Sequence, residues 1–117
     1  DAAVATETLT NLRRVVWFLV GASAGLVHLH ANYIVHCDVA LRNLLADHNH
    51  TCFVCDFGMS QHLPAGQSSV QTSKEGTVPV AWCAPEVLLA RSWSDKSDVY
   101  AFGITLAELM ARDTPFA

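Results

Sequence analysis

The chain has 117 residues, the length of one ordinary domain, and 51% of them are apolar while only 15% are charged. This composition excludes a disordered segment, which would contain too few apolar residues to form a core. The formal net charge is −4, from 7 basic and 11 acidic residues, so we exclude nucleic acid as a partner. The four cysteines lack the spacing of a disulfide framework and indicate a reduced, cytoplasmic protein.

The first predicted element is a long helix over residues 9 to 31. Leucine and valine recur there at helical spacing, and proline is absent. Large apolar side chains such as Trp17 and Phe18 fill the other faces, so we expect a helix enclosed on nearly all sides in a core. The uncharged run from Val15 to Val27 is shorter than the about 20 residues that cross a bilayer, so we predict no membrane segment.

A β-hairpin is predicted next. The short apolar pieces LLA and CFVCDF lie on either side of the polar turn DHNH, in the pattern of two strands and a tight connection. The following stretch, Gly58–Thr77, is rich in Ser, Gln, Gly and Pro, and we expect a long exposed segment.

The last predicted element is a second buried helix over residues 98 to 111. Its apolar face is formed by Val99, Phe102, Leu106 and Leu109, and either Ser97 or Asp95 is expected to cap its start. A shorter apolar piece at Val87–Ala90 precedes it.

A zinc site is the main alternative use of the hairpin residues. His48, His50, Cys52 and Cys55 form H-x-H-x-C-x-x-C, and nitrogen and sulfur ligands suit zinc. In a strand, however, residues three apart point to opposite faces. We therefore favour two cysteines that act as small hydrophobic side chains.

Four short motifs occur in a fixed order along the chain. They are HCD at His36–Asp38 with Asn43 five residues later, DFG at Asp56–Gly58, APE at Ala84–Glu86, and SDVYAFG at Ser97–Gly103. Together they resemble the carboxyl-terminal lobe of a protein kinase catalytic domain, whose motifs run HRD-x4-N, DFG, APE. The resemblance implies an incomplete, kinase-like α+β fold, mainly helical, with a short hairpin that carries the catalytic and DFG loops.

The resemblance also implies which part of a kinase domain the chain represents. Residues 1–117 match helix E, the catalytic loop, the activation segment and helix F. The smaller amino-terminal lobe, with its Gly-rich loop, and the last helices of the larger lobe are expected to be absent from this chain. The missing lobe would then be a partner needed to complete the ATP site.

Phosphoryl transfer explains the residue types at these motifs, because catalysis depends on positioning and on neutralising charge. By resemblance, Asp38, Arg42 and Asn43 are catalytic, with Asp38 accepting the proton of the substrate hydroxyl. Asn43 and Asp56 are expected to hold Mg²⁺, and Asp56 and Leu45 to bind ATP, with adenine resting on Leu45. Outside this motif set, Asp38 and Asn43 would be read as turn residues bonded to their own backbone, and Leu45 as an ordinary strand residue.

Three further positions resemble architectural residues of the family. His36 and Phe57 match its internal hydrophobic spine, and Asp98 matches the aspartate of helix F that tethers the catalytic loop.

The acceptor hydroxyl is predicted to be that of tyrosine. Serine/threonine kinases usually place a lysine two residues after the catalytic aspartate, where this chain has Ala40. Tyrosine kinases favour an arginine four residues after it, and Arg42 is there. The run Pro79–Trp82 resembles the tyrosine kinase substrate platform, although Ala81 replaces its usual basic residue.

Cys37 departs from the family, in which an arginine at this position gathers a phosphate on the activation segment. Gln61 stands where tyrosine kinases often have a second arginine, and residues 58–80 contain no tyrosine. The predicted function is therefore transfer of phosphate from ATP to protein tyrosine by the completed domain, without the usual phosphotyrosine switch. The alternative is a non-catalytic pseudokinase or interaction module with the same fold.

Overall fold

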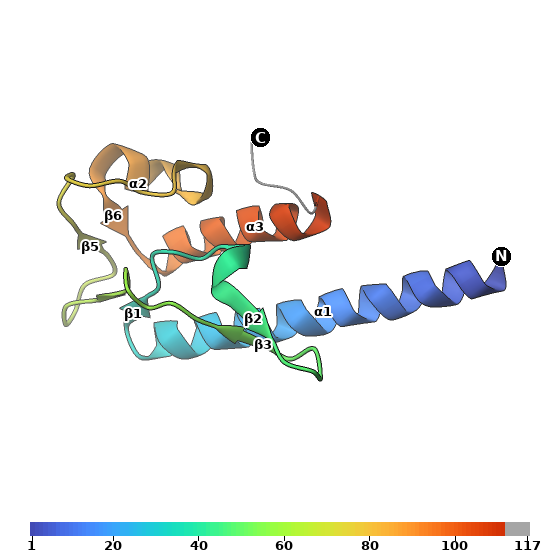
Figure 1. Ribbon diagram of the computed structural model, residues 1–117. Helices are drawn as coiled ribbons and strands as arrows, with labels where there is room; N and C mark the ends of the chain where they lie inside the picture. The colour runs from blue at the N-terminus through green and yellow to red at the C-terminus, as the bar shows by residue number, and fades with distance from the viewer. Residues whose placement is uncertain (112–117) are drawn as a thin grey trace.

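The computed structural model describes residues 1–111, which form helices and small antiparallel sheets (Figure 1). In chain order the elements are α1 (Ala2–Ala31), β1 (Ile34–Val35), the 3-10 turn η1 (Leu41–Asn43), β2 (Leu44–Ala46), β3 (Cys52–Val54), β4 (Gln61–His62), β5 (Val70–Gln71), the 3-10 turn η2 (Val80–Trp82), α2 (Pro85–Ala90), β6 (Ser92–Trp93) and α3 (Asp95–Ala111). The sheets pair β1 with β4, β2 with β3, and β5 with β6. The mixed helix and sheet content agrees with the predicted α+β class.

Helix α1 packs closely on the β2–β3 hairpin through two glycines. A Cβ atom on Gly21 would lie 2.9 Å from the backbone oxygen of Cys52, and one on Gly25 would lie 2.7 Å from a methyl group of Val54. Gly21 therefore needs to be glycine for the helix to approach the strand backbone at this distance, whereas a Cβ at position 25 would require the Val54 side chain to move.

The prediction that α1 is enclosed on nearly all sides is wrong for the described residues. The helix begins at Ala2, capped by Asp1, rather than near residue 9. Only Ala22 and Leu26 are buried, because the amino-terminal half projects beyond the other elements (Figure 1). The large apolar side chains exposed along α1 are Val4, Leu9, Leu12, Val16, Trp17, Val20 and Val27.

By length and composition alone, α1 is also apolar enough to cross a membrane. The same criterion is met by core helices of soluble proteins, which are mostly buried, whereas only 11% of the apolar window of α1 is buried although its second half packs on the hairpin. The absence of a membrane segment stays a prediction.

The predicted hairpin lies where the polar turn indicated. Strands β2 and β3 are antiparallel, with Leu44 opposite Val54 and Ala46 opposite Cys52. The carboxylate of Asp47 accepts hydrogen bonds from the backbone of Asn49 and Thr51 and so closes the turn.

The two hairpin cysteines differ in their surroundings. Cys52 is buried in a core cluster with Ala22 and Leu44, as expected of a small hydrophobic side chain, whereas Cys55 is only half-buried. Burial and the neighbouring Cys55 raise the pKa of the Cys52 thiol to about 11. Across residues 1–111 no three His, Cys, Asp or Glu side chains lie close enough to hold a metal ion.

Most residues of Gly58–Thr77 are exposed, as predicted, but the segment also contains two short strands. Strand β4 pairs with β1, with Gln61 opposite Val35, and β5 pairs with β6, with Val70 opposite Trp93. The backbone of this segment is therefore attached at two places, which its polar composition did not indicate.

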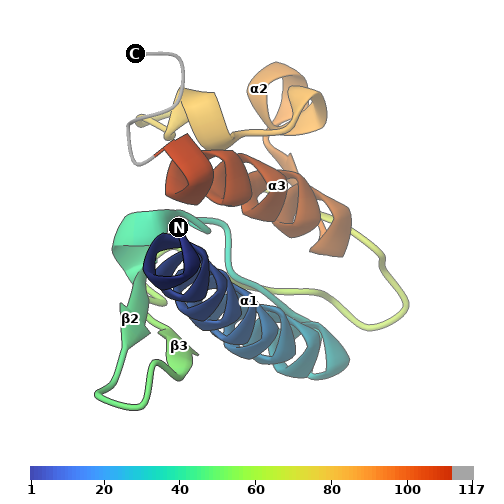
Figure 2. The ribbon, with the colours of Figure 1, turned by 90° about the vertical axis from the view of Figure 1, so that its right-hand side faces the viewer.

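Helix α3 differs from the prediction in its cap and in its buried face. The hydroxyl of Ser94 accepts from the backbone N–H of Ser97, and the Ser97 hydroxyl accepts from that of Ser94, so Ser94 is the cap. The buried residues are Ser97, Asp98, Ala101 and Thr105, whereas Val99 is exposed and the other three predicted core residues are half-buried. Small side chains face inward because α3 lies close above the loop that follows β1, with α1 and the hairpin beyond it (Figure 2).

Candidate active site

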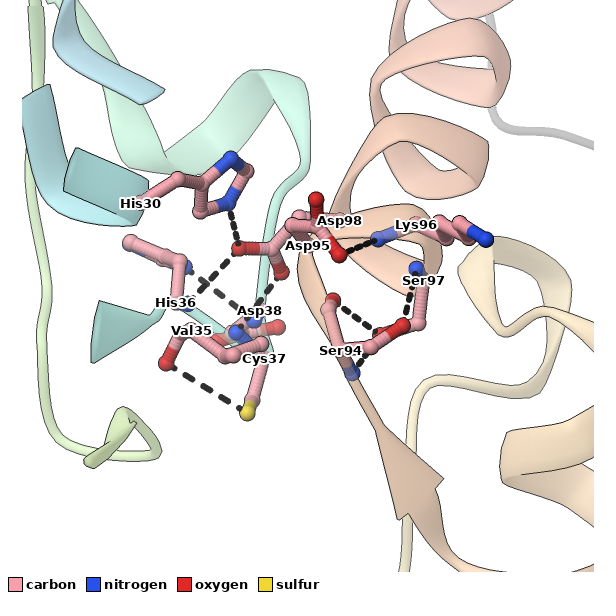
Figure 3. Close-up of polar contacts among 10 residues, drawn as sticks. All are labelled: His30, Val35, His36, Cys37, Asp38, Ser94, Asp95, Lys96, Ser97 and Asp98. Atoms are coloured by element: carbon pink, nitrogen blue, oxygen red, sulfur yellow. Dashed lines mark hydrogen bonds and ion pairs between the residues drawn. The ribbon is translucent and has the colours of Figure 1, made fainter. Parts of the chain in front are cut away.

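The loop between β1 and β2 is held by the buried carboxylate of Asp98 (Figure 3). The backbone N–H groups of His36 and Cys37 donate to its two oxygens at 2.8 and 3.0 Å, and Nε2 of His30 lies 2.8 Å from one of them. Cys37 has a φ of 69°, a left-handed conformation that is costly for a residue with a Cβ atom. The paired hydrogen bonds hold the backbone in this conformation, and the predicted contact between helix and loop is present.

The next residues of the loop bring Asp38, Arg42 and Asn43 together. The Arg42 guanidinium lies 2.5 Å from Oδ1 of Asp38, and Nδ2 of Asn43 donates to the Asp38 backbone carbonyl at 2.7 Å. Arg42 also lies over the ring of Trp82, 5.0 Å from its centre. Arg42 therefore holds the carboxylate of Asp38, and Asn43 holds its backbone carbonyl.

Asp56 lies at the far end of the hairpin from the turn, next to this group. The backbone N–H of Cys55 donates to the carbonyl of Asn43 at 2.8 Å, so Asn43 and Asp56 flank the same end of the β2–β3 ladder. Asp56 has a φ of 59° and an exposed side chain, whose Oδ1 accepts from the Gly58 N–H at 3.3 Å. Carboxylate and amide oxygens of this kind are ligands that Mg²⁺ prefers.

Leu45, the predicted adenine contact, is separate from this polar group. It follows the buried Leu44 in β2, and its side chain is 58% exposed on the opposite face of the strand.

His36 links the loop to the chain before Asp56. It is fully buried, its Nε2 lies 2.8 Å from the carbonyl of Cys55, and its Nδ1 accepts from the Asp38 N–H at 3.1 Å. This pattern requires a neutral ring with the proton on Nε2. The ring also meets that of Phe57 edge to face at 5.5 Å, so the two predicted spine residues are in contact.

The side chain of Cys37 sits in an apolar cluster. Its side chain packs with Val35, Val87 and Trp93. The same cluster is covered by four partly buried side chains of the segment 58–80, Met59, Leu63, Val70 and Val78. Burial, followed by the negative charge of Asp98, raises the pKa of the Cys37 thiol far above its usual range. A neutral hydrophobic group thus occupies the place where the family resemblance predicts an arginine.

The same segment is attached to the region around α2 by polar contacts. The Thr72 N–H donates to the Arg91 carbonyl at 3.1 Å, the Gln71 side chain donates to the Ala90 carbonyl at 2.9 Å, and the Trp93 indole donates to the Thr72 hydroxyl at 3.0 Å. These bonds are made by uncharged groups, so they hold the segment without a phosphate.

Glu108 of α3 was missed by the sequence analysis. Its Oε1 accepts from the backbone N–H of Leu41 at 3.0 Å and from the indole N–H of Trp82 at 3.3 Å. Between Asp98 and the end of α3 at Ala111, Glu108 is the only charged residue. A single charged side chain in an otherwise uncharged stretch is a sequence signal that could have indicated its role.

Comparison with protein families matches residues 4–117 to the family described as protein tyrosine and serine/threonine kinase. The chain belongs to this protein kinase family. The resemblance drawn from the four motifs is therefore confirmed. The match extends from the first turn of α1 through α3, and so includes the whole of the loop and hairpin described above.

Among curated proteins, the kinase chain is similar to ephrin receptors. It is 38% identical over 101 residues to human ephrin type-A receptor 8, which covers 86% of this chain and 10% of the receptor. It is 37% identical over 98 residues to Xenopus laevis ephrin type-A receptor 4-B and 38% identical over 98 residues to Gallus gallus ephrin type-A receptor 7, in each case 84% of this chain and 10% of the receptor. The chain thus spans about a tenth of the length of these relatives.

Proposed function

We propose that residues 1–117 contribute helix E, the catalytic loop, the activation segment and helix F to a protein kinase domain that transfers the γ-phosphate of ATP to tyrosine. The observation that carries this proposal is the loop tethered by Asp98, which holds Asp38, Arg42 and Asn43 beside the hairpin end that bears Asp56. An amino-terminal lobe outside these residues supplies the remaining contacts to ATP.

Each site residue has a defined part in the proposed reaction. Arg42 holds Oδ1 of Asp38, and the other carboxylate oxygen accepts the proton of the tyrosine hydroxyl. The oxygens of Asn43 and Asp56 fit Mg²⁺, and Leu45 offers an exposed apolar side chain to adenine. When bound, Mg²⁺ neutralises charge on the transferred phosphate, and the protein supplies position.

The choice of tyrosine is supported by the contact between Arg42 and Trp82. It places the turn η2, the proposed substrate platform, directly beside the catalytic loop. Val80 of this turn is 64% exposed and offers an apolar surface for the ring of a tyrosine substrate.

A cytoplasmic location fits these residues. The four cysteines are free thiols, which agrees with a reducing compartment that also contains ATP. Since the relatives are named receptors, we further propose that the domain is the cytoplasmic part of a membrane receptor.

Two substitutions in the complete kinase domain test the chemistry. Asp38→Asn is expected to lower peptide phosphorylation at least ~100-fold while the Kd for ATP with Mg²⁺ stays within about threefold, because the proton acceptor is lost whereas Asn43 and Asp56 are kept. Asp56→Asn is expected to weaken Mg²⁺-dependent ATP binding itself. Asp95→Asn, at an exposed carboxylate of α3, is the matched control.

Near-normal turnover in both variants would place the chemistry elsewhere. A wild-type domain that neither transfers phosphate nor binds ATP would support the alternative, a non-catalytic interaction module of the same fold.

We also propose that activity does not require phosphorylation of the activation segment. The apolar cluster around Cys37 and the bonds of Thr72 and Gln71 support this, since they order the segment without charge. Phosphatase treatment of the purified kinase domain should leave its initial rate within about threefold. A fall of about tenfold or more, reversed by rephosphorylation of residues 58–80, contradicts the proposal.

A further inference from the structure

Glu108 joins two parts of the candidate site that are far apart in the sequence. A single carboxylate oxygen, Oε1, accepts from the backbone of Leu41 in the catalytic loop and from the indole of Trp82 in η2. The 3-10 turn η1 begins after Ala40, which offers no side chain to its first N–H groups. Glu108 therefore supplies from α3 the acceptor that a capping side chain would otherwise provide.

Trp82 in turn supports Arg42. The guanidinium lies 5.0 Å from the centre of the indole ring, and its side chain is 48% exposed, so burial does not fix its position. Two contacts do: the ring beneath it and the carboxylate of Asp38. Any rotation of the indole would move the surface on which the guanidinium rests.

The arrangement is therefore a continuous series of contacts from α3 to the proposed proton acceptor. Glu108 contacts Trp82, Trp82 contacts Arg42, and Arg42 contacts Asp38. The second bond of Glu108, to Leu41, holds the backbone next to Arg42. The carboxylate of Glu108 thus restrains Arg42 at its backbone, through Leu41, and at its guanidinium, through Trp82.

We propose that Glu108 is a positioning residue for phosphoryl transfer, which orients Trp82 and the turn η1 so that Arg42 holds the carboxylate of Asp38. This inference rests on the function proposed above. In this role Glu108 makes no contact with substrate. Its replacement is therefore expected to change the rate of phosphoryl transfer and not the affinity for ATP.

The test compares Glu108→Ala with Glu108→Gln in the complete kinase domain. Alanine removes the acceptor, whereas glutamine retains an oxygen that can accept from both Leu41 and Trp82. We expect alanine to lower kcat for a peptide about 10- to 100-fold, as small misplacements of reacting groups do, with the Kd for ATP unchanged within about twofold. Glutamine should restore kcat to within about threefold of wild type.

Two controls separate positioning from loss of structure. Glu7→Ala removes a carboxylate from the exposed part of α1 and should leave kcat unchanged. Trp82→Phe keeps a ring beneath Arg42 but removes the indole donor, and its effect on kcat should not add to that of Glu108→Ala, because both break the same series of contacts. Rates are compared below the thermal transition of each variant.

A second readout does not depend on transfer. The indole N–H resonance of Trp82 and the side-chain N–H resonance of Arg42 should shift in Glu108→Ala and keep their wild-type positions in Glu108→Gln. Equal kcat for alanine and wild type, or additive losses with Trp82→Phe, would overturn the inference. If the wild-type domain transfers no phosphate, the proposed function fails. The resonances still test the inference in that case, because unchanged resonances in Glu108→Ala would show that Glu108 does not position Trp82 and Arg42.

Discussion

Replacement of Asp98 by asparagine tests how the loop between β1 and β2 is held. The substitution conserves shape, so it leaves no cavity, but it replaces one carboxylate oxygen by an NH₂ group. Either the N–H of His36 or that of Cys37 then faces another donor, and both residues are buried. An unsatisfied buried N–H costs about 1–3 kcal/mol, so Asp98→Asn should destabilise the fold by that amount and Asp98→Ala by about 2–6 kcal/mol.

These losses are large beside the about 5–15 kcal/mol that stabilises a typical domain. Urea unfolding followed by tryptophan fluorescence measures them, and with a slope of about 1–3 kcal/mol per molar urea the midpoint should fall by roughly 1 M in Asp98→Asn. Asp95→Asn is the matched control, since its carboxylate is exposed in the same helical turn and should cost less than about 1 kcal/mol. Equal midpoints for the two asparagine variants would refute the tether.

Three further predictions use the same unfolding measurement. Gly21→Ala should destabilise the chain by about 1–3 kcal/mol, because its Cβ would press on the Cys52 backbone. In the control Gly103→Ala the Cβ meets no atom within 4 Å, so this variant should be neutral or stabilising. Equal effects of the two substitutions would contradict the close packing of α1 on the hairpin. Ser94→Ala should cost about 1 kcal/mol through loss of its reciprocal bonds with Ser97, and an unchanged midpoint would show that the cap is unimportant. The Cys52 thiol loses its proton near its ordinary pKa of 9.0 in the unfolded chain and only near 11 in the folded chain. The free energy of unfolding should therefore fall by about 2 kcal/mol between pH 9 and 11 and stay constant below pH 8. A Cys52→Ala variant with the same alkaline loss would contradict this.

The hairpin, and the contact of the β1–β2 loop with α3, were predictable from the sequence because their signals are local or occur in a fixed order. The turn DHNH separates two apolar pieces, and its aspartate closes the turn through its own side chain, which is a short-range effect. Asp98 was placed against the loop only because SDVYAFG was recognised as part of an ordered set of motifs.

Other features could not be predicted because they depend on contacts between distant residues. Apolar spacing shows which side of a helix prefers burial, but not whether another element covers it, and so the exposure of α1 was missed. The role of Glu108 depends on the fold, which brings Leu41 and Trp82 to one side of α3. These residues are too far from Glu108 in the sequence for a local pattern to show the contact. In α3 the close approach of the loop selects Ala101 and Thr105 for burial over larger side chains.

The long sequence separation of the tether has a consequence for the order of folding. The carboxylates of Asp98 and Glu108 come 62 and 67 residues after the backbone groups of His36 and Leu41 that donate to them. Closing loops of that length costs conformational entropy before any bond is gained, so these contacts form late. During synthesis we therefore expect the loop between β1 and β2 to leave the ribosome without its acceptors, and the left-handed turn at Cys37 to be fixed only after α3 has emerged and docked.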